Sequence, residues 1–139
     1  MWNIFNEAKI KDRLFFENVK LIKNKQIFIF STDLKDDDVY CVVINGSVHS
    51  YRLIREPYEL SYNDKYIDKN DISMVFSKTD ICYTHESEYL EWFKKTSCRD
   101  WKEKELYHFY INAEDYVVEF ITDEMPLVTH KSKNDFSED

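Results

Sequence analysis

Glycine is almost absent from this chain of 139 residues, in which Gly46 is the only one. A phosphate-binding loop, a dinucleotide-binding turn, a nucleophile elbow and an EF-hand all depend on glycine. The backbone turns sharply in each of them or approaches a ligand closely. The sequence therefore predicts that none of these motifs is present, and it offers no motif-based catalytic residues.

Long apolar runs are also missing. The longest segment without Asp, Glu, Lys or Arg is 39–51, which is too short to cross a bilayer. Residues 1–16 show no apolar stretch followed by small residues, as a secretory leader would. The three cysteines are far apart, odd in number and without a C-x-x-C pair, which is typical of a reducing compartment. We expect a cytoplasmic protein with no membrane partner.

Basic residues are too few to balance the acidic ones, and the formal net charge is −8. Residues 1–70 carry 11 basic and 11 acidic side chains, whereas residues 71–139 carry 8 basic and 16 acidic ones. Such a chain is a poor nucleic-acid binder, because phosphate neutralisation requires clustered Lys and Arg. It is suited to a basic protein partner. Alternatively, the excess of acidic side chains has no binding role and only maintains solubility.

The remaining composition is that of a globular protein, with 43% hydrophobic, 17% aromatic and 33% charged residues. The length predicts a single domain over 1–130. Residues 131–139 are polar, and we expect them to form a frayed tail.

Patterns of apolar residues predict mostly β-structure. Asn45-Gly46 lies between two such runs and predicts a tight hairpin, because both turn residues require positive φ. In that hairpin Val42 would face His49. The predicted strands are 19–22 with 27–30, 40–44 with 47–53, 72–77, and 106–111 with 116–121.

One helix is predicted over about 87–97. Ser87 can cap it, and Tyr89, Leu90 and Phe93 share one face. A further helix is expected only near 1–14. The fold class is therefore α+β: a mostly antiparallel β-sheet of hairpins, with the main helix packed on one face.

The last predicted hairpin contains His108 and Glu119. A loop centred between Ala113 and Glu114 would place these two side chains directly opposite each other, within an apolar stripe. Three interpretations remain open: a structural cross-strand pair, an anchor for a partner, and a general acid–base dyad. The dyad lacks a nucleophile or metal set nearby in the sequence.

The same hairpin is rich in acids, with no Lys or Arg between His108 and His130. Aromatic anchors beside charges are typical of binding hot spots. We therefore predict a contact surface for a cationic partner here, with a solvated face as the alternative. Its residues are Tyr110, Glu114, Asp115, Tyr116, Asp123 and Glu124.

Metal or cofactor binding is not expected. His85-Glu86 begins like a zinc-protease helix, but Tyr89 occupies the place of the second histidine. The spacings among Cys82, His85, Cys98 and His108 fit no zinc module. The aromatic residues of the predicted helix and of the segment after it are expected in the core; they are Trp92, Phe93 and Trp101.

A series of short motifs resembles a family of small, mostly uncharacterised bacterial proteins. The resemblance covers about 48–128, and two positions depart from the family pattern: Arg99, where glycine is usual, and Glu119, where Asp is usual. The motifs are Glu56-Pro57-Tyr58, Ser87 to Phe93, Ser97-Cys98, His108-Phe109, Asp115, Val118 to Ile121, and Pro126. Some members are encoded beside polymorphic or contact-dependent toxin genes and are proposed as their immunity proteins.

The resemblance implies a cytoplasmic, non-enzymatic protein that binds and neutralises a toxin domain. Acidic and aromatic residues are compatible with this function, because many toxin nucleases have basic clefts. Two alternatives are kept: a small enzyme that uses His108 and Glu119 as an acid–base pair, and a phage anti-defence protein that mimics nucleic-acid charge. Residues 1–70 carry no net charge, which disfavours a protein that mimics nucleic acid.

Overall fold

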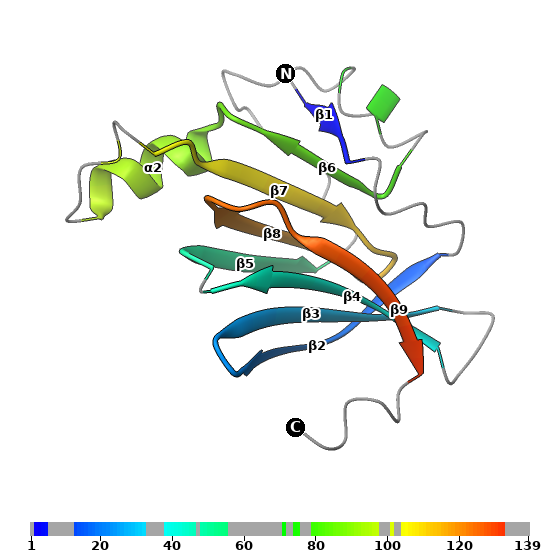
Figure 1. Ribbon diagram of the computed structural model, residues 1–139. Helices are drawn as coiled ribbons and strands as arrows, with labels where there is room; N and C mark the ends of the chain where they lie inside the picture. The colour runs from blue at the N-terminus through cyan, green and yellow to red at the C-terminus, as the bar shows by residue number, and fades with distance from the viewer. Residues whose placement is uncertain are drawn as a thin grey trace.

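The computed structural model describes residues 2–5, 13–32, 38–46, 48–55, 71, 74–75, 79–97, 101 and 104–132. These residues form two antiparallel sheets and one complete α-helix, α2 (Glu88–Thr96), as Figure 1 shows. The predicted α+β class with mostly sheet is confirmed.

The two sheets have five and four strands. The five-stranded sheet has the order β1 (Asn3–Ile4), β6 (Ile81–Thr84), β7 (Tyr107–Asn112), β8 (Tyr116–Thr122) and β5 (Ser50–Arg55). The four-stranded sheet has the order β2 (Leu14–Ile22), β3 (Lys25–Thr32), β4 (Asp38–Asn45) and β9 (Leu127–Ser132).

The first predicted hairpin is confirmed as β2–β3. Its turn consists of Lys23 and Asn24, with φ of 48° and 65°. Two successive positive φ values are typical of a type I′ turn, whose twist suits paired strands. The turn is therefore shorter than the polar segment 23–26 suggested, because Lys25 and Gln26 already pair with Ile22 and Leu21.

The predicted hairpin around Asn45-Gly46 is wrong. β4 pairs with β3 and β9, whereas β5 pairs with β8 in the other sheet. Gly46 does have positive φ (86°), and its N–H donates to the Asn24 carbonyl at 2.7 Å. Gly46 therefore lies in the connection between β4 of the four-stranded sheet and β5 of the five-stranded sheet. An Asn-Gly turn does not reveal which strands will pair.

Other segments also differ from expectation. Met74 and Val75 are helical, not part of a strand over 72–77, although 72–73 and 76–78 lie outside the described residues. Asn3–Ile4 and Leu14 are in strands, which contradicts a helix over 1–14 as far as that segment is described. β9 was not predicted, and it extends two residues into the expected tail.

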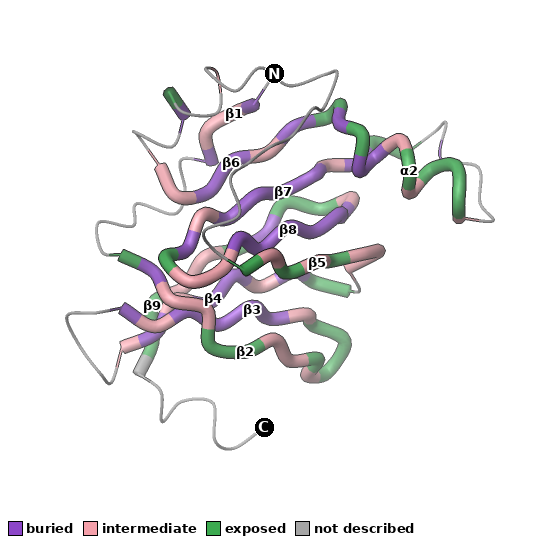
Figure 2. Tube along the Cα trace, turned by 180° about the vertical axis from the view of Figure 1, so that it is seen from behind, coloured by how far each residue is buried: buried purple, intermediate pink, exposed green. Residues whose placement is uncertain are grey.

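The core lies between the two sheets. Phe28 of β3 stacks on Phe120 of β8, with ring centroids 4.9 Å apart, and Phe120 stacks on Phe109 of β7 at 5.2 Å. All three side chains are fully buried. Figure 2 shows burial concentrated in β3, β7 and β8, while β2 is mostly exposed or half-buried. The two inner faces thus form a shared aromatic core.

Helix α2 lies on the outer face of the five-stranded sheet, which is the face turned away from the four-stranded sheet. The Ser87 side chain caps it by accepting a hydrogen bond from the Leu90 N–H at 3.1 Å. Tyr89 and Leu90 are buried against Ile121 of β8, as the apolar stripe predicted. Trp92 was expected in the core but is 53% exposed, because it lies at the edge of that stripe.

Candidate functional site

The β7–β8 hairpin forms, but its register differs from the predicted one. Glu119 lies opposite Tyr110, and His108 lies opposite Ile121. The Ala113 N–H bonds to the Tyr116 carbonyl, so the tip of the hairpin is one residue further along than expected. A strand has a period of two residues, so moving the pairing by two leaves every side chain on its predicted face. His108 and Glu119 therefore become diagonal neighbours.

These two side chains belong to a continuous chain of hydrogen bonds on the outer face, here called the buried network: Ser87, His108, Glu119 and Arg52. His108 Nε2 is 2.7 Å from Glu119 Oε1, and His108 Nδ1 is 2.8 Å from Ser87 Oγ. Arg52 donates to Glu119 twice, from Nε to Oε2 at 2.7 Å and from Nη2 to Oε1 at 3.1 Å. The network ties the helix cap to β7, β8 and β5.

Glu119 is ionised although it is completely buried. Burial by itself raises its pKa, but the hydrogen bonds and charges of His108 and Arg52 outweigh burial and hold the pKa at about 2. Because Glu119 is a carboxylate, the proton in its bond to His108 resides on Nε2. The charge is thus compensated by Arg52, whose side chain is 36% exposed and reaches the surface.

The low pKa of Glu119 predicts that acid destabilises the fold in a defined range. The pKa falls from 4.5 to about 2 on folding, so its stabilisation is complete above pH 4.5 and is lost as the pH drops towards 2. We expect a loss on the order of 3 kcal/mol in the free energy of unfolding, measured by urea denaturation across this range. Glu119→Gln, which cannot titrate, should flatten the dependence; equal slopes in both proteins would contradict the assignment.

The acid–base interpretation requires a substrate to reach His108 and Glu119, whose exposures are 1% and 0%. The ring of Tyr89 from α2 packs edge-on against His108 at 5.0 Å, and the ring of Trp2 does so at 5.1 Å. The pair therefore lies under α2, in the position that a structural cross-strand pair would occupy.

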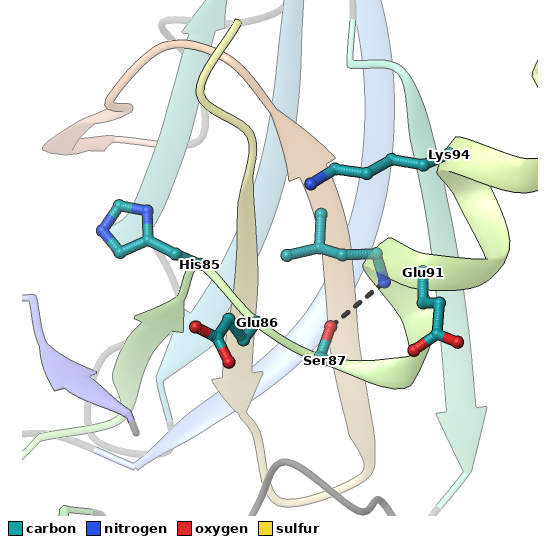
Figure 3. A pocket seen from close by; sticks show the side chains of 6 residues that line it. His85, Glu86, Ser87, Glu91 and Lys94 are labelled. Carbon is teal, nitrogen blue, oxygen red and sulfur yellow. Dashed lines mark hydrogen bonds between the residues drawn. The ribbon is translucent and has the colours of Figure 1, made fainter. Parts of the chain in front are cut away.

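A pocket of about 190 Å³ lies at the start of α2 (Figure 3). Ser87 belongs both to its wall and to the buried network, but the Ser87 Oγ is already bonded to Leu90 N and His108 Nδ1. The exposed side of the pocket carries groups of both charges. Its lining residues are His85, Glu86, Ser87, Leu90, Glu91 and Lys94.

Tyr110, one of the predicted partner-binding residues, is fully buried, which corrects that prediction. Its ring packs against Trp2 at 5.7 Å on the outer face, so it cannot contact a partner in the folded protein. Tyr116 is half-buried, with its ring 5.9 Å from that of Phe16. The sequence placed Tyr110 at the surface, whereas the structure places it in the core.

The four predicted acidic contacts lie at the two ends of β8. Glu114 and Asp115 precede β8, while Asp123 and Glu124 follow it, so roughly 20 Å of strand separates the two pairs. Three of these carboxylates are also engaged within the protein. Glu114 accepts from Arg13 Nε at 2.9 Å, Asp115 accepts from the Phe16 N–H at 2.9 Å, and Asp123 accepts from Lys104 Nζ at 3.0 Å. The four predicted acidic contacts therefore lie in two separate pairs, and three of the carboxylates have partners in their own chain.

The outer face also carries a feature that the sequence did not indicate, here called the Trp92 stack: Trp92, Tyr89 and Arg52. Trp92 stacks on Tyr89 with ring centroids 5.9 Å apart and an angle of 25° between the planes. The Arg52 guanidinium lies 4.0 Å from the centroid of the Tyr89 ring. The only sequence signal was Arg52 itself, a charged residue within the otherwise uncharged strand segment 50–54.

No other chemistry-bearing cluster emerges within the described ranges. They contain no group of three His, Cys, Asp or Glu side chains that could hold a metal ion, and no helix there is long and apolar enough to span a membrane. Burial raises the pKa of the Cys41 thiol to about 11 and also raises that of Cys82, which disfavours the nucleophilic thiolate at both positions. Cys98 and Arg99 lie outside the described residues.

No protein-family model, curated protein or solved structure matches this chain.

Proposed function

We propose that this protein is a non-enzymatic binding protein, an immunity-type inhibitor that neutralises a basic, nuclease-like bacterial toxin domain in the cytoplasm. Two sequence observations support the proposal: the formal net charge of −8 and the resemblance over about 48–128 to proposed immunity proteins. Opposite net charges accelerate association and disfavour wrong partners.

The structural observation that carries the proposal is the exposure of Trp92 on α2. Trp is among the residues that dominate binding energy at protein interfaces. Here the indole stands on a helix that the buried network fixes to the sheet. The contact surface that we propose therefore includes the outer side of α2, and it replaces the predicted surface along the β7–β8 hairpin.

The same network weakens the enzymatic alternative. A dyad of His108 and Glu119 would need a route for substrate, and both side chains are buried under α2. The nucleic-acid mimic requires acids spaced like phosphates over a broad surface. Glu114, Asp115 and Asp123 instead bond to groups of their own chain.

Co-expression with the protein encoded by the neighbouring gene tests this function. We expect restored growth of the host and a complex that survives purification, with an association rate that falls as ionic strength rises. An unrelated acidic protein of similar net charge is the control, and it should neither restore growth nor co-purify. Absence of both rescue and complex for this protein would refute an inhibitory function.

A further inference from the structure

Trp92, Tyr89 and Arg52 are the three residue types most enriched in interface hot spots, and here they form one continuous stack. The exposure of the side chains increases from Tyr89 to Trp92. Tyr89 is buried, the Arg52 side chain is partly exposed, and Trp92 at the outer end is 53% exposed. A large aromatic surface is therefore presented to solvent while the residue behind it is fixed.

The lower part of the stack is held by hydrogen bonds. The Tyr89 hydroxyl lies 2.7 Å from Ser50 Oγ, and the two bonds from Arg52 to the buried Glu119 fix the guanidinium plane. A side chain that is ordered before binding loses less conformational entropy on association. Trp92 therefore packs on Tyr89, whose side chain is already ordered before a partner binds.

The electrostatics of the stack favour a cation at its outer end. The charge of Arg52 is compensated by Glu119, so the stack presents no uncompensated positive charge from this pair. Exposed Glu88 lies one helical turn before Trp92, where an i, i+4 neighbour shares the same face, and Lys95, three residues after Trp92, is paired with Glu91 at 3.3 Å. An indole face beside a carboxylate suits a lysine or arginine side chain, through a cation–π interaction combined with charge attraction.

We propose that the Trp92 stack is the anchor of the toxin interface, and that the exposed indole of Trp92 receives a lysine or arginine side chain of the basic partner. The inference rests on the proposed function, because it names the contact through which that partner is bound. Arg52 and Glu119 act as positioning residues, since they hold Tyr89 and the base of the stack without touching the partner.

Fluorescence quenching can report this contact directly. Of the three tryptophans, Trp2 and Trp101 are buried, so acrylamide should quench mainly Trp92. With the protein encoded by the neighbouring gene as the probe, we expect complex formation to protect most of the quenchable fluorescence. Unchanged quenching in a complex that forms would overturn the proposed contact.

Affinity measurements with matched variants provide the second arm. Removing a hot-spot Trp typically weakens binding about 30-fold or more, so Trp92→Ala should raise the dissociation constant by at least this factor. Trp92→Phe, which retains an aromatic face, should lose clearly less. The control is Leu21→Ala, which removes another exposed apolar side chain, 66% exposed on β2, and should change affinity less than about threefold.

The outcomes separate the two proposals. If Trp92→Ala binds as Leu21→Ala does while the wild-type complex is intact, the anchor is overturned and the inhibitory function stands. If the wild-type protein binds nothing and restores no growth, both proposals fall. Circular dichroism of each variant verifies that Trp92→Ala retains the fold, as expected for an exposed side chain.

Discussion

Replacing Glu119 with alanine is expected to lower the free energy of unfolding by about 3–5 kcal/mol, because it breaks a buried ion pair from one side. The variant removes the two hydrogen bonds that Arg52 donates to Glu119 and the 2.7 Å hydrogen bond between Glu119 and His108 Nε2. His108 is 1% exposed and Glu119 is 0% exposed, so the variant removes a hydrogen-bond partner from a polar group in a buried environment. Urea denaturation followed by far-ultraviolet circular dichroism measures the loss.

Glu114→Ala is the matched control, since it removes the same side chain from the same hairpin. Glu114 also bonds to an arginine, Arg13, but both side chains of this pair are largely exposed. Exposed ion pairs contribute only about 0–1 kcal/mol. Equal losses in the two variants would show that the buried network does not stabilise the fold as its geometry indicates.

The second large effect is expected from Phe120→Ala, with a loss of about 3–5 kcal/mol in the free energy of unfolding. Phe120 is the middle ring of the stack that joins Phe28 of one sheet to Phe109 of the other. Its removal leaves a cavity at the centre of the core, bordered by two fully buried rings. Thermal and urea unfolding should both report the change.

Leu21→Ala serves again as the control, because this side chain is exposed on β2 and its loss creates no cavity. Surface substitutions of this kind change the free energy of unfolding by about 0.5 kcal/mol or less. If Phe120→Ala were as mild as Leu21→Ala, the two sheets could not share the aromatic core described above.

The sequence predicted the elements whose partners are close along the chain. The β2–β3 and β7–β8 hairpins and helix α2 were found from apolar periodicity and from the capping residue Ser87. The face of His108 and Glu119 was also right, although their register was not. The face of the sheet to which a side chain points follows from the two-residue period of the strand, whereas the register of two paired strands depends on the position of the turn between them.

Pairing between distant strands could not be predicted. The segment 40–44 is a continuous apolar run, 50–55 mixes apolar and polar residues, and both are compatible with strands of a hairpin for which Asn45-Gly46 offers suitable turn chemistry. Their actual partners are β3 with β9 for the first and β8 for the second. The sequence therefore predicted no partner for Arg52. Of the buried network, only the pair of His108 and Glu119 was predicted.

Exposure was the weakest part of the site prediction. Tyr110 and Trp92 exchanged their expected environments, because a tyrosine in an acidic hairpin suggested surface and a tryptophan on an amphipathic helix suggested core. Which side of a sheet a helix covers is set by tertiary packing and not by spacing. The aromatic residue available to a partner was consequently identified only from the structure.

The position of β4 between β3 and β9 has a consequence for synthesis on the ribosome. β4 emerges beside β3, but its other neighbour, β9, is translated only after all the strands from β5 to β8. Until then the second edge of β4 exposes unsatisfied backbone donors and acceptors, which invite pairing with a foreign strand. The four-stranded sheet is therefore completed only when the last strand of the chain has been made.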